Sequence, residues 1–310
     1  MLNFPPFDSF SFEKESFPIS FAAAGGGCKA LFALGVGRKL KDWGCKIKEI
    51  SGVSAGSAAA LMLLSNKEEE GIEYFEELLK RNKKNFHFSK LVRGKRPWPH
   101  ENMYRRTIRF SLDFDKIKKG DTKIFILAVK AFPRLQNWKN LWNKINLIPT
   151  TMRAVLLDDR DMERGVIPTR VKKIISKWKL KEVVFTEKDM ESPEITEQII
   201  LNSSSIPPVL SFQKIKGEYY LDGGLTNNLL MEHFSGKYKK IGVYYENTTL
   251  FGKQYINDPN LFLVRPPGKL PIQTFDYTNS IGARETYELG KEIAEGKKKE
   301  ILHFLRGKLI

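Results

Sequence analysis

Two short apolar stretches near the start of the 310-residue chain each end in a turn that leads into a helical pattern. The first covers residues 19–24, ends in three glycines (residues 25–27) and continues with helical periodicity over residues 28–43. The second covers residues 47–50 and is followed by residues 54–64, which are apolar on nearly every side, as in a buried helix. Strands that alternate with helices in this way favour an α/β fold with a mostly parallel sheet.

The rest of the chain supports this fold class and supplies enough material for a core. Apolar residues make up 41% and charged residues 28% of the sequence, which excludes wholesale disorder. A length of 310 residues fits one large domain or two small ones. Further strands are predicted over residues 182–185, 240–245 and 261–264, a hairpin over 209–221, and helices over 68–84, 195–201 and 276–305.

Neither a membrane span nor a disulfide framework is expected. The longest apolar runs, residues 58–64 and 124–129, are far shorter than the roughly 20 residues that cross a bilayer. The two cysteines, Cys28 and Cys45, are too few for a disulfide scaffold and fit a reducing compartment. No basic stretch precedes an apolar one at the N-terminus, so no secretory signal is expected. We therefore expect a cytoplasmic protein and leave export without a cleaved signal open.

Basic residues are concentrated in the middle of the chain. The sequence holds 52 Lys+Arg and 36 Asp+Glu, a net charge of +16. Residues 80–181 contain 28 of the basic and 8 of the acidic residues, together with four of the five tryptophans. Such asymmetry indicates an anionic partner, either a nucleic acid or an anionic membrane. The tryptophans favour lipid, because their amphipathic rings prefer the headgroup level.

Two of these tryptophans lie on one helical stripe. Trp138 and Trp142 recur at helical spacing with Leu135, Leu141 and Ile145, and basic residues lie between them. This pattern is typical of an interfacial helix and predicts membrane docking through the two tryptophans. An ordinary helix that packs its stripe onto the domain explains the pattern equally well. We expect an anionic lipid surface as the partner and no nucleic acid, and the sequence shows no obligate protein partner.

The second turn contains a G-x-S-x-G motif built from Gly52, Ser54 and Gly56. It follows an apolar strand and opens a helix, which is the context of a nucleophile elbow. The tight turn exposes the serine hydroxyl, and the flanking glycines avoid clashes. A lone match is weak evidence, because so short a motif also arises by chance.

The first turn, around residues 25–30, is a candidate anion site. Backbone amides at a glycine-rich helix start bind anions, and an ester hydrolase needs such donors for its oxyanion. The pattern Gly25-x-Gly27-x-x-Ala30 also fits a dinucleotide-binding loop. That alternative requires an acidic residue at the end of the next strand, where the sequence has residues 51–54 instead. We therefore favour the oxyanion interpretation.

A possible base lies at the end of a later predicted strand, in Asp222-Gly223-Gly224. Asp-Gly is a common turn, so the motif gains weight only from the serine that needs a base. Ser54, Asp222 and His233 also follow the chain order of a hydrolase triad. However, His233 comes only 11 residues after Asp222, at an apparent helix start. We interpret it and the other three histidines as structural or solvated.

Taken in order, these motifs resemble the patatin-like phospholipases, which are lipid acyl hydrolases with a Ser-Asp dyad. Residues 25–30 resemble the family's D-G-G-G-x-R-G oxyanion loop, and residues 52–56 are its G-x-S-x-G. Residues 202–207 resemble its A-S-x-A-x-P segment, and residues 222–224 are its D-G-G. The resemblance covers residues 19–65 and 195–245 well and the basic segment hardly at all.

The resemblance implies a single patatin-like catalytic domain over residues 1–310, with a three-layer α/β/α fold. A basic, Trp-containing cap would be inserted at residues 85–181. Ser54 would be the nucleophile that forms an acyl-enzyme, and Asp222 the general base. The amides of Gly25, Gly26, Gly27 and Cys28 would form the oxyanion hole, and Gly52, Gly56, Gly223 and Gly224 would support the two turns.

The implied substrates are membrane phospholipids or lysophospholipids, cleaved at a carboxylic ester by a peripherally membrane-associated enzyme. We expect neither a metal nor a cofactor, because no cluster of ligands has a suitable spacing. Two other functions stay open. A non-catalytic protein that binds anionic lipid or nucleic acid is favoured by the basic segment and by Ala24, Lys29 and Ala30, which replace the loop's Asp, Arg and last Gly. An acyltransferase would share the acyl-enzyme and differ only in its acceptor.

Overall fold

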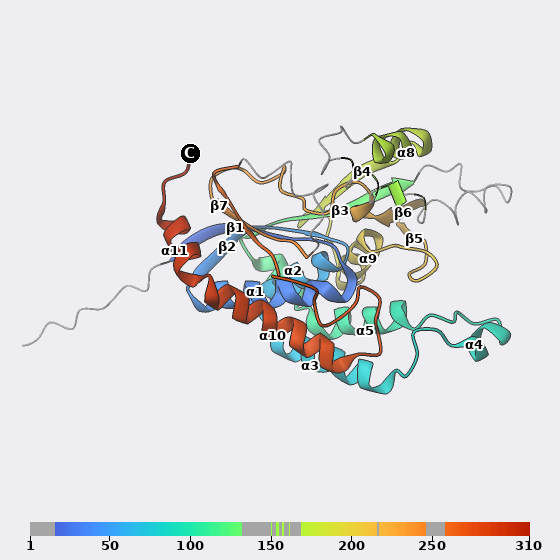
Figure 1. Cartoon of the computed structure of the whole chain (residues 1–310). Coiled ribbons are helices and arrows are strands. Elements are labelled where there is room, and N and C mark those ends of the chain that lie inside the picture. Colours follow the sequence, from blue (N-terminus) through green and yellow to red (C-terminus); the bar gives the residue numbers. More distant parts are fainter. Residues whose placement is uncertain are drawn as a thin grey trace, which may run out of the picture.

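The computed structural model describes residues 16–131, 150, 153–154, 157, 161, 169–215, 217–245 and 258–310. Within these residues, eight strands form one sheet with helices on both of its faces (Figure 1). Followed from one hydrogen-bonded neighbour to the next, they are β5 (Gln213–Ile215), β6 (Glu218–Asp222), β3 (Lys123–Ala131), β2 (Cys45–Val53), β1 (Phe17–Ala23), β7 (Lys239–Val243) and β8 (Leu261–Val264), and β4 (Lys181–Thr186) also pairs with β3.

The central part of the sheet is parallel, and one end of it is antiparallel. β1 pairs in parallel with β2 and β7, β2 with β3, and β7 with β8. β4 and β6 run antiparallel to β3, and β5 antiparallel to β6. The prediction of an α/β fold with a mostly parallel sheet is therefore confirmed. Because β1 and β2 are parallel neighbours, the turns that follow them lie at the same edge of the sheet.

The main core lies between the sheet and the helices on one of its faces. Figure 1 shows α1, α2, α3, α5, α9 and α10 on this face and α8 on the other. α2 is buried on nearly every side because it is almost entirely apolar. The bounds are α1 (Leu31–Asp42), α2 (Ala55–Ser65), α3 (Glu68–Arg81), α5 (His100–Ser111), α8 (Arg170–Trp178), α9 (Pro193–Ser203) and α10 (Ser280–Gly296).

Alternate side chains of β3 contribute to cores on the two faces of the sheet. Ala128 belongs to the main core, whereas the next residue, Val129, packs with Leu221 against Ile174 and Trp178 of α8. This alternation follows the period of two of a strand. The remaining short elements are the 3₁₀ helices η1 (Gly27–Ala30) and η4 (Gly223–Leu225), and the helices α4 (Phe88–Val92), α6 (Phe114–Lys119) and α11 (Lys298–Arg306).

The structure corrects two expectations about these elements. The expected cap at residues 85–181 contains β3, which pairs with β2, β4 and β6, so this part of it belongs to the sheet. The long C-terminal helix over residues 276–305 is two helices, α10 and α11, with a break at Lys297. The single-domain assignment and the outer limits of the cap stay predictions.

The predicted docking residues Trp138 and Trp142 lie outside the described residues. No helix in the described part of the chain is long and apolar enough to cross a membrane.

Candidate active site

Ser54 lies in a strained turn between β2 and α2. Its φ of 53° and ψ of −130° fall in a region that non-glycine residues rarely adopt, at a cost of about 1–3 kcal/mol. The motif glycines make the turn possible. A Cβ at Gly52 would lie 2.4 Å from the Cα of Ser57, and one at Gly56 would lie 2.4 Å from the carbonyl oxygen of Ala23. Both positions therefore require glycine, and strain of this kind is common at functional sites.

Strand pairing brings Asp222 to Ser54. β2 pairs Val53 with Leu127, and β6 pairs Asp222 with Ala128, the next residue of β3. β4 pairs with residues 125–130 of β3, a stretch that overlaps the residues paired with β2 and those paired with β6. β4 therefore occupies one edge of β3, and β2 and β6 share the other. Since β2 is parallel and β6 antiparallel to β3, their carboxyl ends meet head to head. Ser54 directly follows Val53 and therefore lies beside Asp222.

The carboxylate of Asp222 is buried and only partly hydrogen bonded. Its Oδ1 accepts a 2.7 Å hydrogen bond from the amide of Gly224, while Oδ2 has no hydrogen-bond partner within the described structure. Burial raises the pKa of Asp222 to about 6, against a smaller lowering by the Ser54 hydroxyl and the Gly224 amide. The Ser54 hydroxyl thus lies near the carboxylate but makes no hydrogen bond to Oδ2. Such a long contact is common in active sites before substrate binds, because catalytic hydrogen bonds often shorten only in the complex.

The glycine loop after β1 adjoins the same serine. A Cβ at Gly25 would lie 3.0 Å from the Cβ of Ser54 and 2.6 Å from Oδ1 of Asn228. Gly27 has a φ of 57°, and a Cβ there would lie 2.0 Å from the carbonyl oxygen of Thr274. The loop therefore approaches its neighbours so closely that these positions accept no side chain.

The four amides of this loop differ in their hydrogen bonds. Gly25 donates to Oδ1 of Asn228 at 3.0 Å, and Cys28 donates to the carbonyl oxygen of Thr274 at 3.0 Å. Within the described part of the chain, the amides of Gly26 and Gly27 donate no hydrogen bond. As far as the described residues show, these two of the four donors are thus available to a ligand without breaking an existing bond.

Two residues that sequence reasoning left without a role hold the site together. Asn228 bonds Gly25 twice, because its Nδ2 also donates to the Gly25 carbonyl oxygen at 3.2 Å. Ser203 of α9 accepts a 2.9 Å hydrogen bond from the amide of Ser54 and donates to the carbonyl oxygen of Leu127. The asparagines after residues 222–224 and the serines of residues 202–207 stand out in the sequence. Their hydrogen-bond partners cannot be predicted from neighbouring residues, because they lie far away along the chain.

None of the four histidines, all within the described residues, hydrogen bonds to Ser54 or Asp222. His233 stacks on Phe125, with ring centroids 5.8 Å apart. The Nε2 of His100 donates a 2.9 Å hydrogen bond to the carbonyl oxygen of Phe275, which lines the cavity of the site. No group of three or more potential metal ligands occurs among the described residues.

Ser54 and Asp222 open into a cavity of about 230 Å³. A smaller cavity of about 60 Å³ adjoins it among α1, α2, α3 and α5, with a lining that is almost wholly apolar. The two cavities share Gly27, Ala55, Tyr104 and Tyr277. The larger one is lined by Gly25, Gly26, Gly27, Ser54, Ala55, Tyr104, Ser204, Ile206, Leu210, Asp222, Gly224, Leu225, Asn228, Thr274, Phe275 and Tyr277.

The sequence pattern of the family described as "Patatin-like phospholipase" matches residues 21–234, more than half of the chain. The chain belongs to the patatin-like phospholipase family. The matched range contains the glycine loop, the turn of Ser54 and the strand end of Asp222. Membership places this patatin-like chain among the lipid acyl hydrolases.

Among solved structures, the patatin-like chain is similar to the crystal structure of VipD from Legionella pneumophila. The two share 14% sequence identity with a TM-score of 0.39, over 91% of this chain and 67% of that one. No curated protein matches the patatin-like chain in sequence.

Proposed function

We propose that this patatin-like protein hydrolyses carboxylic esters of membrane phospholipids or lysophospholipids through a Ser54–Asp222 dyad. The observation that carries the proposal is the head-to-head meeting of β2 and β6 on β3. It sets a serine in a strained turn beside a buried carboxylate, one oxygen of which has no hydrogen-bond partner among the described residues. No histidine is needed to complete the pair.

In the first step, the hydroxyl of Ser54 attacks the ester carbonyl carbon while its proton passes to Oδ2 of Asp222. The tetrahedral intermediate collapses, the alcohol leaves with that proton, and an acyl-enzyme remains. Water then attacks the acyl carbonyl and gives its proton to Asp222. The second tetrahedral intermediate collapses, Asp222 returns that proton to the leaving Ser54 oxygen, and the fatty acid is released. The raised pKa of Asp222, about 6, makes it a better base than an exposed carboxylate and leaves it ionised at neutral pH.

The oxyanion is held by backbone amides of the glycine loop. We assign this role first to Gly26 and Gly27, whose amides are free of hydrogen bonds among the described residues. Gly25 and Cys28, which the resemblance also implied, would have to release Asn228 and Thr274. Each oxyanion donor is typically worth about 3–4 kcal/mol of transition-state stabilisation.

The apolar cavity beside Ser54 supports an acyl substrate. Its walls carry almost no exposed polar surface, and it shares Gly27 and Ala55 with the cavity that contains Ser54. The first carbons of an acyl chain placed there would be removed from water, while the wider cavity around Asp222 would accept the polar part of the lipid. An alcohol acceptor in place of water would make the protein an acyltransferase, which product analysis with added alcohols distinguishes.

Labelling with a fluorophosphonate tests the nucleophile. The wild-type protein and Ser65→Ala, which changes another buried serine on α2, should be labelled, and Ser54→Ala should not. Asp222→Ala should be labelled far more slowly, because the proton acceptor is lost. Labelling of Ser54→Ala at the wild-type rate, or no labelling of the wild type with lipid vesicles present, would overturn the proposal.

A further inference from the structure

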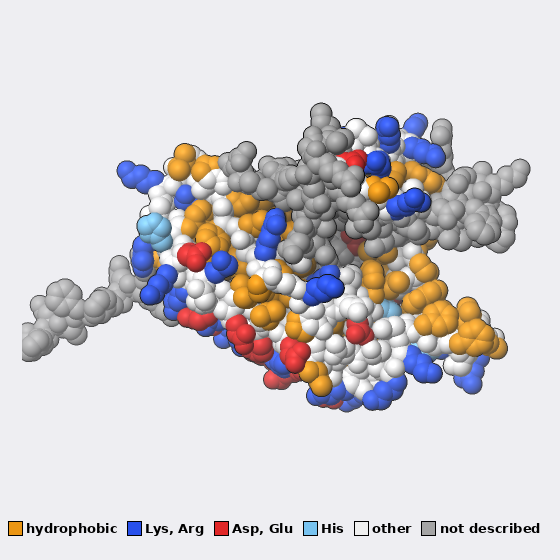
Figure 2. Space-filling view, in the orientation of Figure 1, with side chains coloured by type: hydrophobic (Ala, Val, Ile, Leu, Met, Phe, Trp, Pro, Cys, Tyr) orange, Lys and Arg blue, Asp and Glu red, His pale blue; other side chains and the backbone are white. Residues whose placement is uncertain are grey.

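A segment between α3 and α5 projects from the body of the molecule and carries exposed apolar side chains. We call residues 83–98 the α4 tip, because α4 lies at its end (Figure 1). Half of the large exposed hydrophobic side chains in the described part of the chain lie here. They are Phe86, Phe88, Leu91 and Val92, with exposed fractions of 41%, 67%, 49% and 72%. Figure 2 shows this apolar group at the end of the projection, with basic side chains beside it.

The α4 tip is purely cationic. It contains no acidic residue, and its exposed basic side chains make no ion pair within the described structure. These side chains are Lys83, Lys84, Lys90, Arg93 and Lys95.

An exposed apolar group rimmed by cations matches the chemistry of an anionic bilayer. The apolar side chains can enter the boundary between headgroups and acyl chains, while the cations meet the lipid phosphates. A nucleic acid would use the cations and gain little from Phe88 and Val92. An acidic protein surface would leave the apolar end of the tip without a partner. The lipid surface is the occupant that uses both features.

The base of the α4 tip is bonded to one wall of the active-site cavity. Oδ1 of Asn85 accepts a 2.8 Å hydrogen bond from the amide of Tyr277, and its Nδ2 donates to Asp276 at 3.3 Å. Just before the tip, Asn82 donates to the carbonyl oxygen of Tyr277 at 2.7 Å. Tyr277 lines the cavity that contains Ser54 and Asp222, so this wall and the tip form one connected unit.

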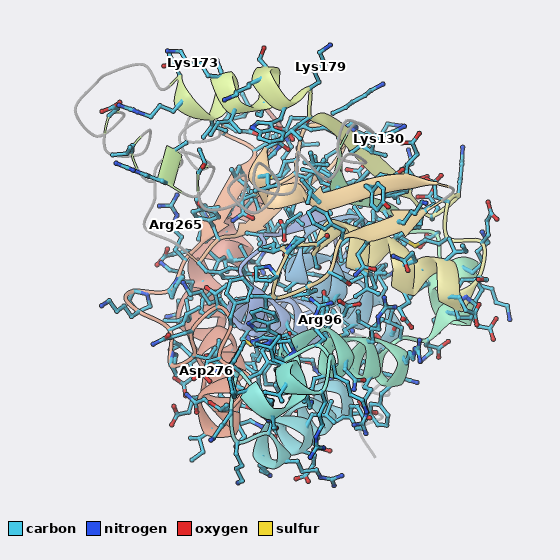
Figure 3. All side chains as sticks on the ribbon, turned by 90° about the vertical axis from the view of Figure 1, so that its right-hand side faces the viewer. Arg96, Lys130, Lys173, Lys179, Arg265 and Asp276 are labelled. Carbon is cyan, nitrogen blue, oxygen red and sulfur yellow. The ribbon has the colours of Figure 1, made fainter. Side chains whose placement is uncertain are left out.

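The returning segment of the tip is bonded to another wall of the cavity. Arg96 donates to the carbonyl oxygens of Pro208 and Val209, each at 2.8 Å, and also pairs with Glu101. Pro208 and Val209 lie between Ile206 and Leu210, which both line the cavity. Figure 3 views the molecule from the side on which α4 projects and shows Arg96 and Asp276 on that side.

We propose that the α4 tip docks the protein on an anionic lipid bilayer, with Phe88 and Val92 inserted and the basic side chains on the headgroups. The bonds at its base then hold the mouth of the catalytic cavity against the membrane surface. This inference rests on the proposed lipid hydrolysis for its purpose, while docking itself needs no catalysis.

Vesicle flotation in a Ser54→Ala background tests docking without digesting the lipids. The probes are vesicles of phosphatidylcholine alone and of phosphatidylcholine with about a third phosphatidylserine. Phe88→Ser/Val92→Ser should lower partitioning onto the anionic vesicles at least tenfold, because burial of one such side chain is typically worth that factor. The control Ile310→Ser changes a side chain that is 87% exposed at the opposite end of the molecule, and should bind normally (Figure 1).

Charge reversal tests the cationic rim separately. Lys90→Glu/Arg93→Glu should lower partitioning onto the anionic vesicles at least tenfold, because each basic residue near such a surface contributes about fivefold. Partitioning onto phosphatidylcholine alone should stay the same. Lys308→Glu, an exposed lysine near the C-terminus, is the control and should bind as the parent does.

The outcomes separate docking from catalysis. Loss of flotation in both tip variants, with fluorophosphonate labelling of the same variants on Ser54 unchanged, supports docking. Flotation of the tip variants at the parent level, or no flotation of the parent with anionic vesicles, overturns docking. Neither of these latter results alters the labelling, which by itself decides the proposed function.

Discussion

Replacing Asp222 with asparagine should make the protein more stable and inactive at once. Burial raises the pKa of this carboxyl from an ordinary 3.8 to about 6. The folded protein therefore binds the proton more tightly than the unfolded chain does. Between pH 4 and pH 6 the native state loses stability as pH rises, and above pH 6 the full cost of an ionised buried carboxylate is present.

The size of this cost follows from the pKa difference. One pKa unit corresponds to about 1.4 kcal/mol, so Asp222 destabilises the native state by about 3 kcal/mol above pH 6. Asparagine has nearly the same shape, can accept the Gly224 hydrogen bond and never ionises. We therefore expect Asp222→Asn to unfold at higher urea concentration at pH 8, by a free energy approaching that value. The advantage should be about half as large at pH 5 and small near pH 4.

Urea unfolding at the three pH values measures this directly, with hydrolysis of a soluble ester assayed on the same samples. Asp115→Asn is the control, because the Asp115 side chain is 80% exposed and should change stability little at any pH. Equal unfolding midpoints for Asp222→Asn and the wild type at pH 8, or a difference that does not depend on pH, would refute the argument from burial.

Two further predictions concern the rate. The kcat/KM of the wild type should rise with pH through about 6 and fall about tenfold per pH unit below it, since the base must be ionised; a profile flat down to pH 4.5 would contradict this. Asn228→Ala removes both side-chain bonds to Gly25 and should lower kcat at least tenfold by displacing the oxyanion loop. Its neighbour Asn227 bonds Glu232 instead, so Asn227→Ala should lower stability and leave kcat unchanged. Equal kcat values for the two variants would argue against a role of the Asn228–Gly25 bonds in holding the loop.

The proposed nucleophile and base could be picked out in the sequence because each lies in a local pattern of glycines at a strand end. The central strand β3 could not, since Ile124 to Val129 form a short apolar run inside a highly basic segment and show no alternation. A run of this kind is what a strand buried on both faces requires. The alternation of apolar and polar residues that identifies a half-buried strand is therefore missing from β3, and the position of β3 in the sheet follows only from its pairing with other strands.

The details of the oxyanion loop also depend on residues far along the chain. The sequence indicates the loop, but two of its amides, those of Gly25 and Cys28, are bonded by Asn228 and Thr274, about 200 residues or more further along the chain. The same holds for Ser203, which meets Ser54 across 149 residues. Contacts of this kind are set by the topology of the sheet and leave no local pattern.

The meeting of two strand ends on β3 also determines when the proposed dyad can form during synthesis. Val53 and Asp222 pair with consecutive residues of β3, so the dyad exists only after all three strands have joined in the right register. A slip of β6 by one residue would carry Asp222 about 3.3 Å along the sheet and turn its side chain to the opposite face. In a growing or misregistered chain, Ser54 therefore lacks the carboxylate that the proposed mechanism requires, and ester hydrolysis is expected only once the sheet is complete.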